Sequence, residues 1–145
     1  LVDTNRLDSV DLIDQPKLNF LLGSATQAAQ RVRIVGCPNL TGHLILGRDL
    51  DSLELRDVAS LETLSINGPV PANTVLEGLR NLEVAELAGE NIREEHFDAL
   101  LQCKAMRELT LAIPNLPAAT LRKIGQFKAL TVLNVPGAQI DDDVV

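Results

Sequence analysis

Aromatic residues are scarce in this sequence, and basic residues are outnumbered by acidic ones. Only 2 % of the 145 residues are aromatic, namely three phenylalanines without tryptophan or tyrosine. The chain therefore lacks the stacking surfaces of single-strand nucleic-acid binders and the usual aromatic anchors of protein interfaces. Its 13 basic residues stand against 20 acidic ones, which gives a net charge of -7. That charge repels phosphate backbones and anionic membranes, so we expect no nucleic-acid partner.

Cysteines and long apolar runs are scarce as well. Cys37 and Cys103 are too few for a disulfide framework, and we expect both to be buried free thiols. The longest uncharged segment, 18–30, is too short and too polar to span a bilayer, and no signal-like segment is present. We therefore expect a soluble protein without membrane insertion, with the cytoplasm slightly favoured. The compartment stays open, because a signal, an anchor or a further domain could precede Leu1.

What the sequence does contain is a repeat. Between Ile92 and Ile140 the apolar residues return every 24 positions. One series is matched position by position by the next, as Ile92, Phe97, Leu100, Cys103, Met106, Leu109 and Leu111 are by Leu116, Leu121, Ile124, Phe127, Leu130, Leu133 and Val135. A period of this size is typical of solenoids, in which each unit buries its apolar face by stacking on its neighbours.

The strand part of each repeat reads L-x-x-L-x-L. This motif predicts five strands, at 44–46, 61–66, 82–87, 106–111 and 130–135. A sixth is predicted at 18–22, and successive strand centres are then about 20 to 24 residues apart, within the range of leucine-rich repeats. Leu109 and Leu133 occupy the same place in consecutive repeats, so we expect both to be buried in adjacent layers of one core.

The segments that connect these strands change character along the chain. Apolar spacing, acidic starts and a helix-starting proline predict helices over 93–104 and 116–125, with a shorter one over 71–79. Short alternating segments predict extended chain over 32–34 and 53–55 instead. We therefore expect extended returns in the N-terminal half and helical returns in the C-terminal half.

Residues 1–17 show no repeat and form the expected N-terminal flank or cap. Leu7, Val10 and Ile13 could make one apolar stripe over the open end of the stack. Residues 18–145 form the expected array of about five to six units, of which the last is incomplete. We expect the parent protein to continue beyond Val145 with a further partial repeat or a cap.

This spacing resembles the leucine-rich repeat proteins, in particular the bacterial 24-residue and cysteine-containing subclasses. The resemblance is specific over 61–145 and weaker over 40–60, and it departs from the pattern at Ala85 and Phe127. It implies an α/β fold, a right-handed leucine-rich repeat solenoid with a parallel sheet on its concave face. Such a face generally binds other proteins.

Alternation along each strand places two columns of side chains on that concave surface. The first candidate column is His43, Thr63, Val84, Glu108 and Val132, and the second is Ile45, Ser65, Glu86, Thr110 and Asn134. The surface is small, neutral to acidic and free of aromatic residues. We expect it to accept a flat or basic protein surface, or else to be simply solvated.

No arrangement of residues predicts catalysis. Cys37 and His43 could be imagined as nucleophile and base, but no spacing motif supports them, and His96 is expected to be solvated on an outer helix. The run 141–143 of three aspartates fits the first turn of a helix better than a calcium site. Metal-ligand spacings and phosphate-binding glycine loops are missing. We therefore expect no enzyme activity, no cofactor and no metal.

Three functions remain as hypotheses. The first is a non-catalytic scaffold that binds a partner protein of unknown identity through the concave sheet or its edge loops. The second is the recognition arm of a larger enzyme or effector whose catalytic domain lies outside this chain. The third is a structural array that associates with itself, for instance through its C-terminal end, where the last strand would leave a sheet edge open.

Overall fold

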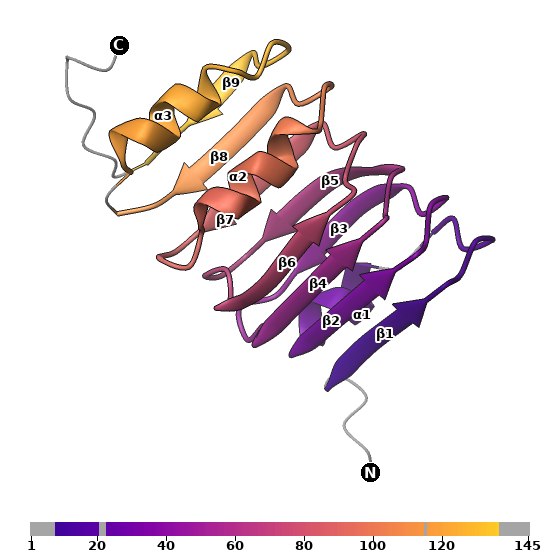
Figure 1. The fold of residues 1–145 in the computed structure, drawn as a ribbon. Helices are drawn as coiled ribbons and strands as arrows, with labels where there is room; N and C mark the ends of the chain where they lie inside the picture. The colour runs from indigo at the N-terminus through magenta and orange to yellow at the C-terminus, as the bar shows by residue number, and fades with distance from the viewer. Residues whose placement is uncertain (1–7, 21–22, 115, 137–145) are drawn as a thin grey trace.

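The computed structural model describes residues 8–20, 23–114 and 116–136, and its architecture is α/β, with parallel strands in two sheets and few helices (Figure 1). The first sheet has four strands in the order β1 (Ser9–Ile13), β2 (Arg31–Val35), β4 (Ser52–Arg56) and β6 (Asn73–Glu77). Neighbouring strands are parallel and in register. Leu53 and Leu55 point into the core, whereas Glu54 between them does not. The extended segments predicted at 32–34 and 53–55 are therefore confirmed.

The second sheet has five parallel strands. Their order is β3 (Gly42–Leu46), β5 (Leu61–Ile66), β7 (Val84–Ala88), β8 (Glu108–Ala112) and β9 (Val132–Asn134). From β2 to β7 the chain passes alternately through the two sheets (Figure 1). Ala85 on β7 is the register partner of Leu64 on β5 and of Leu109 on β8. All three side chains point inward and are 0 % exposed. The five strands predicted from the L-x-x-L-x-L motif are confirmed.

Two helices replace the four-stranded sheet towards the C-terminus. α2 (Glu94–Leu101) lies beside β6, and α3 (Ala118–Ile124) lies beside α2 on the same side of the five-stranded sheet (Figure 1). The acidic Glu94 and Glu95 stand in the first turn of α2, where the helix dipole favours negative charge. Pro117 precedes the first residue of α3 in an extended conformation. The helices predicted over the last two returns are confirmed.

A third helix, α1 (Gly23–Ala28), forms next to the place where a sixth strand was predicted at 18–22. That prediction is wrong for residues 18–20, which form no strand, while Leu21 and Leu22 lie outside the described residues. α1 packs against β3, and the Thr26 hydroxyl donates a hydrogen bond of 2.7 Å to the Ile45 carbonyl oxygen. The edge of the five-stranded sheet is thus closed by a helix rather than by another strand.

The segment 71–79, predicted to be a short helix, is instead the strand β6. Thr74 is 2 % exposed and Leu76 is 8 % exposed, while the residues between and beside them are more accessible, which is the alternation of a strand. The β-branched Thr74 and Val75 also favour extended chain over helix. Pro71 accepts a hydrogen bond of 2.6 Å from the Thr74 hydroxyl through its carbonyl oxygen. The apolar spacing of this short segment fits both periods, and its β-branched residues decide between them.

The N-terminal flank also differs from its prediction. Because residues 9–13 form a strand, Val10 and Leu12 share a face and pack against the core, whereas Ile13 points to the other side. The stripe of Leu7, Val10 and Ile13 is therefore wrong for its two described members, and Leu7 lies outside the described residues. β1 is the edge strand of the four-stranded sheet.

Burial falls off sharply at the last strand. Leu109 is 0 % exposed, as predicted, but its register partner Leu133 is 42 % exposed and Val132 is 50 % exposed. The prediction that Leu133 is buried like Leu109 is wrong. β9 is the edge of its sheet, with β8 on one side and no other described strand beside it.

Each strand of the four-stranded sheet ends in a residue with a left-handed backbone. Asp14, Gly36, Asp57 and Gly78 follow β1, β2, β4 and β6 with φ values of 52°, 68°, 56° and 69°. Their amides extend the ladder, since the Asp14, Gly36 and Asp57 N–H groups donate to carbonyl oxygens of the neighbouring strand. A side chain on Gly36 would place its Cβ 2.4 Å from Asp14 Oδ1, and one on Gly78 would come within 2.8 Å of Asp57 Oδ1. The positive φ favours glycine at both positions, and a side chain at either would force the aspartate beside it to move.

Candidate functional site

The ten residues predicted for the binding face lie together on the outer face of the five-stranded sheet. Strand register places one row of side chains across β3, β5, β7, β8 and β9, composed of His43, Thr63, Val84, Glu108 and Val132. The second row is two residues further along each strand, composed of Ile45, Ser65, Glu86, Thr110 and Asn134. We call these ten residues the sheet face. Each has a partly or fully exposed side chain.

Both acidic side chains of the sheet face lie on its central strands, but their surroundings differ. The Ser65 hydroxyl donates a hydrogen bond of 3.0 Å to Glu86 Oε2, and no cation among the described residues pairs with Glu86. Glu108 instead accepts a hydrogen bond from Arg107, whose Nε also lies 3.4 Å from Glu83 Oε2. Glu86 therefore carries the uncompensated charge of this surface.

A Cys–His catalytic pair is not formed. Cys37 is 0 % exposed, and its thiol lies 3.7 Å from the carbonyl oxygens of Leu12 and Val35, in the interior behind β2. His43 is exposed on β3 of the other sheet. In the described ranges no group of three or more histidine, cysteine, aspartate or glutamate side chains is placed to hold a metal ion.

Cys103 is buried as predicted, with an exposed fraction of 2 %. Its thiol donates a hydrogen bond to the Leu79 carbonyl oxygen, and burial raises the pKa of the thiol to about 11. Cys37 and Cys103 are both free thiols. A thiol that stays protonated and enclosed is a packing residue rather than a nucleophile.

His96 is the clearest difference between the predicted and observed positions. It was expected to be solvated on an outer helix, but it is 2 % exposed, on the side of α2 that faces β6. Its Nδ1 accepts a hydrogen bond of 3.0 Å from the Arg93 backbone N–H, and Nε2 lies 2.9 Å from the Thr74 carbonyl oxygen. These contacts fix the neutral ring with the proton on Nε2, so His96 caps α2 and joins it to β6.

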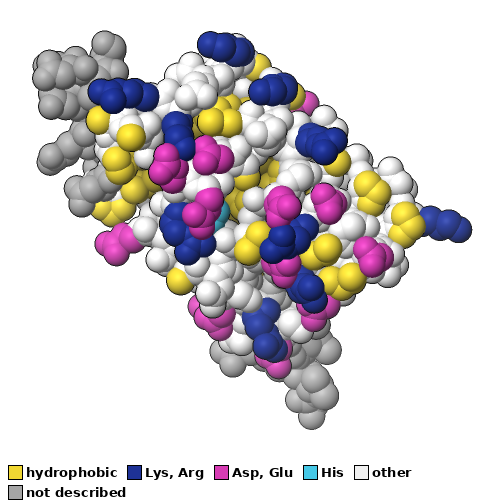
Figure 2. All heavy atoms as spheres, in the orientation of Figure 1, with side chains coloured by type: hydrophobic (Ala, Val, Ile, Leu, Met, Phe, Trp, Pro, Cys, Tyr) yellow, Lys and Arg dark blue, Asp and Glu magenta, His cyan; other side chains and the backbone are white. Residues whose placement is uncertain are grey.

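The outer face of the four-stranded sheet carries an ion-pair ladder that the sequence analysis did not single out. Glu54 accepts bonds from Arg33 Nε at 2.9 Å and Arg56 Nε at 2.6 Å, and Arg56 also pairs with Glu77. The hydrogen bond from Arg56 is the main cause that lowers the pKa of the Glu54 carboxyl. Figure 2 shows basic and acidic side chains intermixed over this face. Charges that already compensate one another favour solvation of this face over selective binding.

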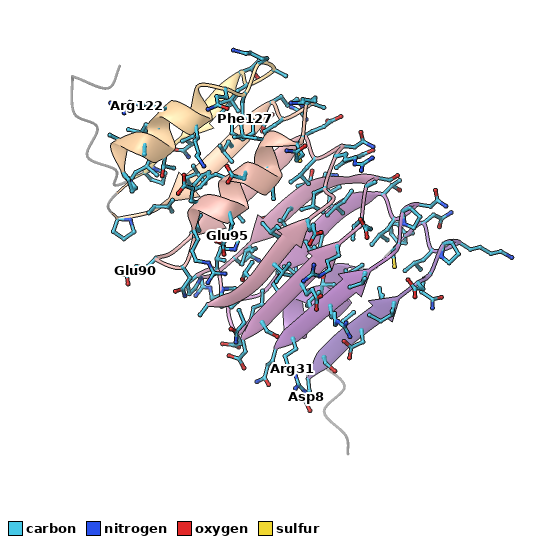
Figure 3. The ribbon with its side chains drawn as sticks, in the orientation of Figure 1. Asp8, Arg31, Glu90, Glu95, Arg122 and Phe127 are labelled. Carbon is cyan, nitrogen blue, oxygen red and sulfur yellow. The ribbon has the colours of Figure 1, made fainter. Side chains whose placement is uncertain are left out.

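A shallow hollow of about 500 Å³ lies at the start of these strands. Arg31 and Arg93 contribute to its wall, and Figure 3 shows Arg31 at the lower edge of the sheet, close to Asp8. The acids Asp11 and Glu54 also line the hollow, so it does not gather charge of one sign.

The positions of the ten residues on the sheet face could be predicted from the sequence, because the columns of leucines determine which residues of each strand point outward.

None of the described helices is long and apolar enough to cross a membrane. No protein-family model, curated protein or solved structure matches this chain.

Proposed function

We propose that this chain is a non-catalytic leucine-rich repeat scaffold that binds a partner protein through the sheet face. One observation carries the proposal: strand register brings ten partly or fully exposed side chains into two rows across five strands, and none of them is used to build the core. Such a surface is broad, pre-formed and free of the clustered groups that catalysis needs.

The leucine-rich repeat part of the proposal rests on the order of elements. Strands of the five-stranded sheet follow one another at steps of 20 to 24 residues, and a strand or helix on the opposite side separates each from the next. In the proposed solenoid, each step is one turn, and the five-stranded sheet is the concave side of a right-handed arc.

The chemistry of the sheet face favours a partner with a basic surface. Glu86 presents a carboxylate that no described cation neutralises, and the chain as a whole carries a net charge of -7. Ile45, Val84 and Val132 supply the apolar area, and the threonine, serine and asparagine side chains between them offer hydrogen bonds. A basic partner would be attracted over long range by the charge and held at short range by these groups.

The test is affinity capture from the native extract with three forms of the protein. The variant Glu86→Lys should lose the captured partner while keeping its melting temperature, because exposed charges contribute little to stability. Arg122→Glu is the control, since Arg122 is exposed on α3, away from the five-stranded sheet (Figure 3). Capture that survives Glu86→Lys and disappears with Arg122→Glu would move the binding site to the helices.

Self-association through β9 is a second candidate, favoured by the exposure of Val132 and Leu133 on an open sheet edge. No charged residue lies between Ala129 and Pro136 to discourage pairing with another strand. Sedimentation velocity over a range of concentrations should then show a dimer that Val132→Lys abolishes. A protein that remains monomeric at every concentration would rule this candidate out.

A further inference from the structure

A second concave feature lies on the opposite side of the molecule from the sheet face, between the first turns of α2 and α3. It is a hollow of about 440 Å³, which we call the helix cleft. Ile92, Phe97 and Ile113 form its apolar part, and Phe97 and Ile113 are themselves 2 % and 8 % exposed. A hollow of this size with an apolar lining falls within the range of sites that take a small ligand or a few side chains.

The cleft follows from a local difference between two equivalent repeats. α2 begins with Glu94 and Glu95, whereas the matching positions at the start of α3 are Ala118 and Ala119. At the first turn of α3 the wall of the cleft is therefore built from short side chains, namely Ala119 and Thr120. Longer side chains at the start of α3 would occupy this space.

The charge around the cleft is negative. Glu90 is exposed on its rim and forms no ion pair with any described residue (Figure 3). Lys123 is the one basic residue among the described lining residues, and its Nζ lies 2.7 Å from both Glu94 Oε1 and Asp98 Oδ1. The hydrogen bonds that Lys123 donates to Asp98 and then to Glu94 raise the pKa of Lys123, so its charge is present but already compensated. An incoming anion would meet carboxylates here, and an incoming cation would meet Glu90.

We propose that the helix cleft docks a short peptide segment of a partner protein, in which a bulky apolar side chain stands next to a lysine or arginine. The apolar side chain enters the cleft against Ile92, Phe97 and Ile113, and the neighbouring cation pairs with Glu90 on the rim. This inference is independent of the sheet face, since it uses residues of the helices and their connections alone.

The test is selection of a random peptide library on the full chain. Wild-type protein should enrich peptides with an apolar residue beside a basic one, and Ala119→Trp, which fills the cleft, should enrich none. Ala118→Trp is the matched control, because Ala118 is exposed on the same turn of α3 but does not line the cleft. It should select the same peptides as the wild type. Equal enrichment by both tryptophan variants, or enrichment of acidic peptides, would overturn the proposal.

The charge is tested on the selected peptides by fluorescence anisotropy. Glu90→Lys should weaken binding about tenfold, the factor that corresponds to one lost charge contact in a partly desolvated site. Glu95→Lys is the control, because Glu95 lies on the same helix end without lining the cleft. If no peptide is enriched, or if Ala119→Trp instead abolishes a dimer of the wild-type chain, the cleft does not take a partner peptide. The second result would assign it to another copy of this chain.

Discussion

Leu109 and Leu133 offer a matched test of the register, because they are equivalent in the repeat and paired on adjacent strands. Leu109 is 0 % exposed, so Leu109→Ala removes a fully buried side chain and leaves a cavity, at a cost of about 2–5 kcal/mol in the free energy of unfolding. Leu133 is 42 % exposed, so it loses less buried area and leaves no enclosed cavity. We expect Leu133→Ala to cost about 1 kcal/mol.

Thermal and urea unfolding followed by circular dichroism measure both variants. For a chain of this length a loss of 1 kcal/mol lowers the melting temperature by about 2–4 °C, so Leu109→Ala should lower it by about 4–20 °C and Leu133→Ala by about 2–4 °C. Equal losses for the two variants would refute the reasoning, because they would mean that β9 is covered as completely as β8. An unchanged melting curve for Leu109→Ala would show that the inward column is assigned wrongly.

Four other substitutions test particular positions. Gly36→Ala should cost about 1–3 kcal/mol, because its Cβ would meet Asp14 Oδ1, while Gly42→Ala, which also has a positive φ but nothing within 4 Å, should cost about 1 kcal/mol in urea titrations. His96→Phe should cost about 1–3 kcal/mol, since it removes the acceptor of the Arg93 N–H and leaves the Thr74 carbonyl oxygen with the Arg93 guanidinium as a longer contact, and amide exchange at the start of α2 should rise. Cys103 should resist thiol reagents at neutral pH. Folding raises the pKa of the Cys103 thiol, so its contribution to the free energy of unfolding is complete below the ordinary thiol pKa and is lost as the pH rises towards about 11. Between those two pH values, Cys103→Ala should therefore lose less stability with rising pH than the wild type does.

The repeat predicted most of the five-stranded sheet, because leucines at a fixed spacing become register partners on neighbouring parallel strands and are buried together on the inner face of the sheet. The elements that it missed have other causes. The segment 71–79 is too short for its apolar spacing to separate a helix from a strand, and the β-branched Thr74 and Val75 determine the outcome. The helix α1 forms beside a strand edge whose Ile45 carbonyl oxygen needs a donor, which no periodicity reveals.

The candidate sites show the same division. The sheet face follows from strand alternation alone, so its ten residues could be named in advance. The buried position of His96 could not, because it depends on the Thr74 carbonyl oxygen and the Arg93 amide, which the fold brings to its two ring nitrogens. The helix cleft depends on short side chains at the start of α3, where Ala118 and Ala119 stand at the positions that Glu94 and Glu95 occupy at the start of α2. The difference in side-chain size can be read from the sequence, but its consequence cannot, because the cleft exists only where α2 packs beside α3.

The alternation of aspartate and glycine after the strands of the four-stranded sheet couples the conformations of neighbouring strand ends. Asp14 Oδ1 lies where the Cβ of a side chain at Gly36 would stand, and Asp57 lies in the same way beside Gly78. A side chain at Gly36 meets only the end of the Asp14 side chain, which can rotate away. At Gly78 the new Cβ would also stand 3.0 Å from the backbone nitrogen of Asp57, so the main chain itself would have to move there. The two glycines are therefore not equivalent, and Gly78 tolerates less change than Gly36.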